Sequence, residues 1–386
     1  MSIRKRSWTT AKGVEKEAWV VDYFDGTGVR RQKTFTKKKE ADAFAATAKV
    51  EVREGVHVAD SASVSVREAG AFWIASGEGA NLERSTINQR KRHVKYHIDP
   101  FIGGTLLSRL TVPSVRDFED RLRQECRSPA MLRKVLGSLG SILTDAQERG
   151  LATRNPVKDM RGTRRKGKER QAEKRKKGKL KVGEDIPGRD EVKALVGALE
   201  GHWRPLLITA VFTGMRSSEL RGLRWQDVDF HGRAIHVRQR ADEFGEIGPP
   251  KSEAGTRTIP VPPFVVNTLK EWSVRAVHDL VFANPDGNPR SHTNIINKGL
   301  IPAMLKAGVV TVDGKAKYTG MHALRHFFAS WLINRKEDGG LGLPPKVVQE
   351  RLGHGSIVMT MDTYGHLFPR GDDSKELEDA ATALLA

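Results

Sequence analysis

The stretch HALRHFFASW, residues 322–331, combines an apolar helix face with a face of basic and imidazole groups. The apolar residues recur at the spacing i, i+3, i+4 and i+7 of one α-helix face; they are Leu324, Phe327, Phe328 and Trp331. His322, Arg325 and His326 fall on the opposite face. We therefore expect the aromatic side to pack into a core and the other side to point outward, although a solvated polar face would show the same pattern.

The two histidines of this stretch are also spaced like zinc ligands on a helix. His322 and His326 are four residues apart, but Ala323 stands where a zinc-protease helix carries its glutamate. The sequence therefore predicts no metal at this helix.

Four further short segments carry residues suited to phosphate chemistry. They are TGMRSSELRGLRW (213–225) with Arg216, PPKSEAGTRTIPV (249–261) with Lys251, LGHGS (352–356) with His354, and MDTYGH (361–366) with Tyr364. Guanidinium groups suit phosphate because their contacts are planar, bidentate and permanently charged. Cleavage of a phosphodiester needs a nucleophile, stabilisation of charge on the non-bridging oxygens and an acid for the leaving oxygen. These side chains could supply all three.

Each of these residues also has a plainer interpretation. Arg216 stands near a predicted helix start, where it opposes the helix dipole unless an anion shares the site, but with Glu219 it could form a surface ion pair contributing only about 0.2–0.5 kcal/mol. Lys251 is predicted to lie on a hairpin turn, where solvated lysines are common. His354 follows Gly353, a predicted helix C-cap. Tyr364 shares a helix face with apolar neighbours and could be a core tyrosine.

The five segments, in this order, resemble the tyrosine recombinases, the phage-integrase family, from Ile186 to Leu384. The resemblance implies that Arg216 and Arg325 bracket a scissile phosphate and that Lys251 protonates the leaving oxygen. The catalytic set it implies is Arg216, Lys251, His322, Arg325, His354 and Tyr364, with Glu219 and His326 in supporting roles. Tyr364 would attack phosphorus to form a 3′-phosphotyrosyl bond, and no metal or other cofactor would be needed.

The same resemblance implies a site-specific DNA recombinase, the integrase of a phage or mobile genetic element. Such enzymes act on double-stranded DNA attachment sites as homotetramers and pass through a Holliday junction. A lambda-like architecture also implies a host DNA-bending protein and an excisionase as partners. Two alternatives stay open: a type IB topoisomerase, which shares this chemistry, and a DNA-binding accessory protein without catalysis.

The composition favours a polyanionic partner. The 386 residues carry a net charge of +19 and the pI is near 10.0, which is typical of nucleic-acid-binding proteins, although a ribosomal-type or merely basic protein would look similar. Cys126 is the single cysteine, so an internal disulfide is excluded and a reducing compartment fits. No apolar run reaches the roughly 18 residues that span a bilayer. We expect a soluble protein of the bacterial cytoplasm, acting at the nucleoid and not at a membrane.

The first 60 residues predict a small ββ(β)α domain. Residues 18–24 and 29–35 read as strands around a turn, and a helix capped by Thr36 and stopped by Gly55 follows. Arg30, Arg31 and Lys33 would present the second strand to DNA phosphates, in resemblance to the arm-binding domain of lambda-type integrases, unless they are a solvated face.

Residues 61–160 predict a helical domain. Ser65 and Glu68 form a capping box, further helices follow Ser85 and Pro113, and another spans residues 130–148. The helix after Ser85 carries the predicted DNA-binding residues Arg90, Lys91, Arg92 and Lys95. By position, this domain resembles the SAM-like core-binding domain of the family.

The chain is expected to divide at a strongly basic segment. Residues 161–181 hold twelve Lys/Arg and two Glu, and a like-charge run of this kind cannot form a core. We therefore expect a linker at 161–185 and a mixed α/β catalytic domain at 186–386. Within the latter, helices are expected near 190–200 and 203–212, strands near 234–238 and 256–261, and a final helix from Asp373 to Leu385. The whole chain is predicted to be mostly α with small β-sheets.

Overall fold

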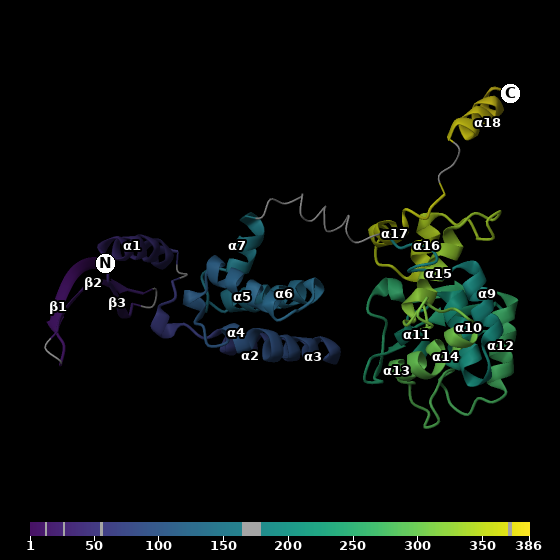
Figure 1. The fold of residues 1–386 in the computed structure, drawn as a ribbon, viewed down its shortest axis with the longest axis horizontal. Helices are drawn as coiled ribbons and strands as arrows, with labels where there is room; N and C mark the ends of the chain where they lie inside the picture. Colours follow the sequence, from purple (N-terminus) through teal and green to yellow (C-terminus); the bar gives the residue numbers. More distant parts are fainter. Residues whose placement is uncertain (12–13, 26–27, 55–56, 164–178, 370–372) are drawn as a thin grey trace. The chain divides into compact units, whose positions relative to one another are not determined.

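The computed structural model describes residues 1–386 except 12–13, 26–27, 55–56, 164–178 and 370–372. The chain divides into two compact units, Met1–Ala172 and Glu173–Ala386 (Figure 1). The division falls inside the predicted basic linker, most of which lies outside the described residues. The further boundary near residue 60 stays a prediction.

The first unit begins with a three-stranded antiparallel sheet in the order β1-β2-β3. The strands are β1 (Ser2–Thr9), β2 (Glu15–Phe24) and β3 (Arg30–Phe35), and α1 (Lys38–Arg53) follows. Val21 and Tyr23 of β2 are buried against Ala41 and Ala45 of α1. The ββ(β)α prediction is confirmed, with β1 as the third strand. The predicted cap is wrong, because Lys37 holds the N-cap position without a side-chain bond, and Gly55 lies outside the described residues.

The rest of the first unit is a helical bundle around one apolar core. Its α-helices are α2 (Val66–Gly79), α3 (Arg84–His93), α4 (Asp99–Ile102), α5 (Val112–Gln124), α6 (Pro129–Glu148) and α7 (Pro156–Thr163). The capping box of Ser65 and Glu68 is present at the start of α2, as predicted. The helix expected after Ser85 begins at Arg84 instead, with Glu83 as its N-cap.

The second unit is mostly helical and contains two small sheets. Its helices are α9 (Arg189–Ala198), α10 (Arg204–Thr213), α11 (Ser217–Arg221), α12 (Pro263–Ser273), α13 (His292–Asn294), α14 (Ile301–Lys306), α15 (His322–Ile333), α16 (Pro345–Leu352), α17 (Ile357–Tyr364) and α18 (Asp373–Leu385). One sheet has the order β4-β5-β8, with β4 (Val228–Asp229), β5 (Ala234–Val237) and β8 (Arg257–Pro260); β6 (Arg240–Ala241) pairs with β7 (Ile247–Gly248). The helices and strands predicted for this half are confirmed to within a few residues.

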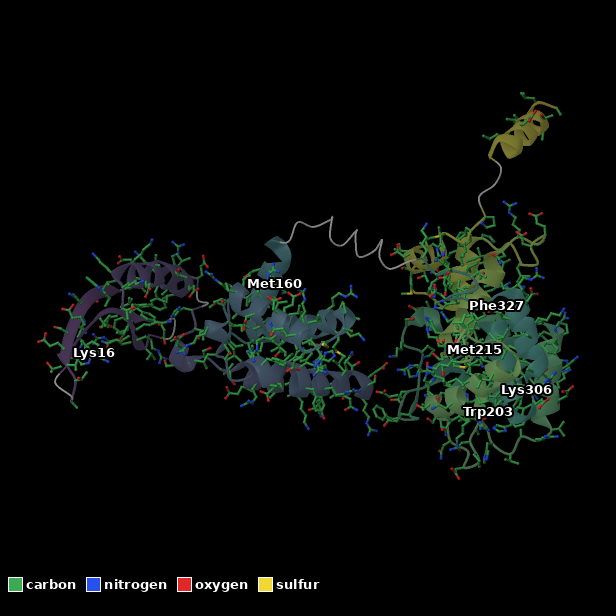
Figure 2. The ribbon with its side chains drawn as sticks, in the orientation of Figure 1. Lys16, Met160, Trp203, Met215, Lys306 and Phe327 are labelled. Carbon is green, nitrogen blue, oxygen red and sulfur yellow. The ribbon has the colours of Figure 1, made fainter. Side chains whose placement is uncertain are left out.

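Helix α15 lies within the core of the second unit. Figure 2 labels Phe327 of this helix and Met215, and both are buried members of the core of the second unit. The apolar face is confirmed, but the expectation that the opposite face points to solvent is wrong for Arg325, whose exposed fraction is 2%. α10 and α16 both pack against α15, so protein covers Arg325 on the second face, whereas His322 on the same face is exposed, as expected.

Gly214 ends α10 with a left-handed backbone (φ +58°). A Cβ at this position would lie 2.4 Å from Cδ1 of Phe328 in α15. The chain can therefore turn from α10 toward Arg216 only with glycine here, because an L side chain is disfavoured at this φ and would collide with a buried ring.

Gly214→Ala is expected to lower the free energy of unfolding by about 1–3 kcal/mol through backbone strain and overpacking. The measurement is urea unfolding of the purified variant. Gly197→Ala in α9 is the matched control, because a Cβ there meets nothing within 4 Å. That change should raise stability by up to about 1 kcal/mol. Equal unfolding curves for the two variants would contradict the packing described here.

Candidate active site

Arg325 is tied to the C-terminal ends of two helices. Its Nη1 donates to the carbonyl of Gly214 after α10 (2.7 Å), and its Nη2 donates to the carbonyl of Leu352 at the end of α16 (2.5 Å). Carbonyls at helix C-termini lack partners within the helix and carry partial negative charge. The bonds therefore hold the guanidinium in one plane, and its remaining N–H groups stay available for another acceptor.

Two further arginines bind the same end of α16. Arg216, the N-cap residue of α11, donates from Nη2 to the carbonyl of Gly353 (3.0 Å). Arg257 of β8 donates from Nε to the carbonyl of Arg351 (2.8 Å). Gly353 has a left-handed backbone (φ +64°), and a Cβ there would lie 2.9 Å from the carbonyl oxygen of Ala254. The C-terminal end of α16 thus places three consecutive carbonyls against three arginines.

Glu219 joins two of these arginines. Its Oε1 accepts from Nη1 of Arg216 (2.7 Å), and its Oε2 accepts from Nη2 of Arg257 (2.9 Å) and from the backbone N–H of Arg216 (2.9 Å). The side chain is only 2% exposed. The plain interpretation of Arg216 and Glu219 as a surface ion pair is therefore wrong. Three guanidinium groups face one carboxylate here, so the cluster of Arg216, Arg257 and Arg325 keeps an excess of positive charge suited to an anion.

The pKa values of the cluster reflect this crowding. Burial, followed by the charge of Arg216, lowers the pKa of Arg325 to about 9, so the group remains cationic at neutral pH. Burial alone would raise the pKa of Glu219, but Arg257 and Arg216 outweigh it and hold that pKa below its usual range. A bound anion would relieve the repulsion among the arginines.

Tyr364 ends α17 with its side chain 1% exposed. The ring of His354 stacks on the tyrosine ring with an interplanar angle of 3° and 6.3 Å between centroids. Nδ1 of His354 lies 2.9 Å from Oγ1 of Thr360 in α17, which fixes the imidazole orientation. Burial, then the charges of Arg325 and Arg216, lowers the pKa of His354 to about 4, so this imidazole is neutral at pH 7.

The hydroxyl of Tyr364 lies 2.7 Å from Nδ1 of His326. Burial raises the pKa of Tyr364 to about 12, although Arg325 pulls it downward. Burial, then His322 and Arg325, lowers the pKa of His326 to about 4. At neutral pH the pair is therefore a neutral tyrosine hydrogen-bonded to a neutral imidazole.

His322 and Lys251 are more exposed to solvent than the other predicted catalytic residues. His322 begins α15, and its ring is perpendicular to that of His326 at 4.7 Å between centroids. Partial burial, then Arg325 and Arg216, lowers the pKa of His322. Lys251 is exposed on the segment between β7 and β8, six residues before Arg257. The structure thus brings together Arg216, His322, Arg325, His354 and Tyr364 with Glu219 and His326, and places Lys251 on the loop that leads into the arginine cluster.

Two residues of the site, Arg257 and Thr360, were not predicted from the sequence. A signal for Arg257 existed, because it shares the period-two face of β8 with the buried residues Ile259 and Val261. A buried arginine needs a carboxylate or carbonyl partner, and the side chain of Arg257 is 6% exposed. Thr360 gave no comparable signal.

Most of the predicted DNA-binding residues of the first unit have partners inside the protein. Arg30 binds Asp22, Arg31 binds Asp25, and Lys33 lies 3.0 Å from Asp60. In the helical part, Arg90 donates to the carbonyl of Trp73 (2.7 Å) and lies over its ring, Lys91 pairs with Glu78, and Lys95 lies over Tyr96, while Arg92 is exposed. Their binding of DNA stays a prediction.

Among the residues that the structure describes, no group of three or more histidine, cysteine, aspartate or glutamate side chains is arranged to hold a metal ion. Within the same part of the chain, no helix combines the length and the apolar character that crossing a bilayer requires.

Together these groups place a cluster of three arginines beside a buried tyrosine, an arrangement suited to an anion. Residues 188–370 match the Phage integrase family. A "Tyrosine recombinase XerC-like" protein of Caldanaerobacter subterraneus subsp. tengcongensis is 24% identical over 375 residues, covering 90% of each chain. The ICEBs1 integrase of Bacillus subtilis is 25% identical over 381 residues, covering 94% of this chain and 95% of that protein.

Solved structures share the fold. The Tn1549 transposon integrase, in complex with transposon right end DNA, matches with a TM-score of 0.64 and 20% identity, covering 83% of this chain and 100% of that one. A lambda integrase tetramer bound to a Holliday junction matches with a TM-score of 0.55 and 16% identity, covering 91% and 95%. Residues 188–370 therefore form a phage integrase family domain, and the protein is a tyrosine-type site-specific recombinase.

Proposed function

We propose that this protein cuts and rejoins double-stranded DNA at specific attachment sites through a 3′-phosphotyrosyl bond to Tyr364. The observation that carries the proposal is the placement of the Tyr364 hydroxyl in a cluster of imidazoles beside the buried Arg325. A phosphodiester held by Arg325 and Arg216 would lie near both cations and the tyrosine. The integrases of transposons and phage lambda that share this fold were solved on DNA.

The proposed reaction is a transesterification. The Tyr364 oxygen forms a bond to phosphorus, the bond from phosphorus to the 5′ oxygen breaks, and Lys251 protonates that leaving oxygen. Arg216 and Arg325 donate hydrogen bonds to the non-bridging oxygens, where charge develops. His322 and His354, whose ring is held by Thr360, would donate to the same oxygens. The reverse attack by a partner strand's 5′-hydroxyl rejoins the DNA, so bond energy is conserved.

The proposed biological role is integration, and excision, of a phage or other mobile genetic element at the nucleoid of a bacterial cell. Two strand exchanges by a homotetramer would pass through a Holliday junction. α18, with Leu377, Leu384 and Leu385 exposed, is a candidate surface for a neighbouring protomer. A host DNA-bending protein and an excisionase would set the direction of the reaction.

Tyr364→Phe is expected to abolish formation of a covalent protein–DNA adduct, a loss of at least about 10³-fold, because the variant lacks the nucleophilic oxygen. The substrates are nicked duplexes from a library of genomic junctions, and adduct is measured on a denaturing gel in EDTA. DNA affinity should stay within a factor of about two, because the hydroxyl contributes no phosphate charge contact.

Tyr96→Phe serves as the control, because Tyr96 belongs to the first unit and is 53% exposed, so loss of its hydroxyl leaves the packed core unchanged. This variant should form adduct at the wild-type rate. An adduct formed equally well by Tyr364→Phe, or DNA binding without any adduct across the whole library, would refute the proposal.

A further inference from the structure

The structure distinguishes between the two histidines of the HALRH segment. His326 places Nδ1 2.7 Å from the Tyr364 hydroxyl, whereas His322 lies one helical turn earlier, with its ring against that of His326. The Tyr364 side chain is almost completely buried, so bulk water has little access to its hydroxyl. A proton leaving this oxygen therefore needs an acceptor within the protein, and His326 is the group in hydrogen-bonding contact.

We propose that His326, and not His322, accepts the proton of Tyr364 as the tyrosine oxygen attacks phosphorus. The inference rests on the proposed function. The bond from Oη to phosphorus forms, the bond from phosphorus to the 5′ oxygen breaks, and the Oη proton moves to Nδ1 of His326. The leaving oxygen takes its proton from a different group, Lys251. In the rejoining step the imidazolium of His326 returns the proton to Tyr364.

The charged groups around Tyr364 and His326 determine when the proton moves from the tyrosine to the imidazole. His322 and Arg325 on α15 disfavour the imidazolium of His326, while Asp185, in the segment before α9, favours it. With the pKa of His326 at about 4 and that of Tyr364 at about 12, the proton stays on the tyrosine in the protein without DNA. A phosphate bound to the arginines would offset their charge, and the phenol becomes far more acidic as its oxygen bonds to phosphorus. Transfer is therefore coupled to attack, and no free tyrosinate forms beforehand.

Two substitutions of His326 distinguish proton acceptance from positioning of the Tyr364 hydroxyl. His326→Asn can keep a hydrogen bond to the hydroxyl but cannot take its proton, whereas His326→Ala loses both. If His326 is the base, both variants should cleave about 10²–10⁴-fold more slowly than wild type in single turnovers. Their rates should also rise with pH across the range 6–9, because hydroxide must replace the imidazole, while the wild-type rate should vary less.

A DNA substrate with sulfur in place of the bridging 5′ oxygen distinguishes the role of His326 from that of Lys251. A thiolate leaves without protonation, so this substrate should restore cleavage by Lys251→Ala, which lacks the acid. It should leave His326→Ala and His326→Asn slow, because their defect is on the side of the nucleophile. Thermal unfolding and DNA affinity of each variant establish that fold and binding persist.

Three results would overturn the inference. The first is cleavage at the wild-type rate by His326→Asn, and the second is recovery of cleavage by His326→Ala on the sulfur substrate. The third is a pH-dependent cleavage defect in His322→Asn that the His326 variants do not show. Failure of the proposed function would look different, because wild type itself would then form no adduct or would form it without Tyr364.

Discussion

Replacing Glu219 with alanine is expected to lower the free energy of unfolding by about 3–5 kcal/mol, because breaking a buried ion pair leaves its partners uncompensated. Glu219 is 2% exposed and accepts hydrogen bonds from both Arg216 and Arg257. The carboxylate also closes the first turn of α11 by accepting from the backbone N–H of Arg216. Its loss would release the arginine cluster and the start of α11 together. Urea unfolding of the variant measures the effect.

Glu200→Ala is the matched control for this substitution. Glu200 forms an ion pair with Lys306, but its side chain is 75% exposed, and exposed pairs of this kind contribute between zero and about 1 kcal/mol. If both substitutions had the same small effect, the carboxylate of Glu219 would not organise the site as described.

The pH dependence of the Glu219 contribution has a definite sign. Because its pKa in the folded protein is held below the usual value, the stabilisation is fully present above the unfolded-state pKa. It is lost as the pH falls through the folded-state pKa. The difference in stability between wild type and Glu219→Gln should therefore be constant near neutrality and shrink in acid.

Arg325→Ala is expected to reduce single-turnover cleavage by at least about 10³-fold, since removal of one preorganised donor to a developing oxyanion commonly costs 10²–10³-fold. The substitution also leaves the carbonyls of Gly214 and Leu352 without their shared donor. Arg325→Lys should remain about 10²-fold or more below wild type, because an ammonium cannot span both carbonyls and present a planar fork to phosphate.

The corresponding control is Arg335→Ala. Arg335 lies just beyond α15, with its side chain 43% exposed next to Glu337. The cleavage rate of the Arg335→Ala variant should match that of the wild-type protein. Wild-type cleavage by a folded Arg325→Lys protein would mean that Arg325 is a structural tie between α10 and α16 and does not contact phosphate.

Much of the fold could be predicted because local patterns and burial agree in this chain. The apolar period of α15, the capping box at Ser65 and the strand later seen as β8 were all readable from residue spacing. The burial of Arg325 was not, because the sequence gives the two faces of a helix but not what covers each of them. Here α10 and α16 cover the part of the second face that carries Arg325, and the carbonyls at their C-terminal ends accept hydrogen bonds from the buried cation.

The resemblance to a known family identified most residues of the site, but it did not predict which of them are in contact. The hydrogen bond between His326 and Tyr364 joins positions 38 residues apart and depends on how α17 packs beside α15. In the same way, Arg30, Arg31 and Lys33 form a basic strand in the sequence, but the antiparallel register of β2 and β3 brings Asp22 and Asp25 within reach of the two arginines. Which charged and polar side chains meet in the fold is the information that one sequence does not supply.

Identifying the amino acid that is bonded to DNA tests the proposed role of Tyr364 as the nucleophile. Wild-type protein is trapped on a nicked substrate, the adduct is digested with trypsin and nuclease, and the linked peptide is sequenced by mass spectrometry. We expect one nucleotide phosphate on Tyr364, attached through the 3′ side of the cleaved strand. Linkage to any other residue, or through a 5′ phosphate, would contradict it.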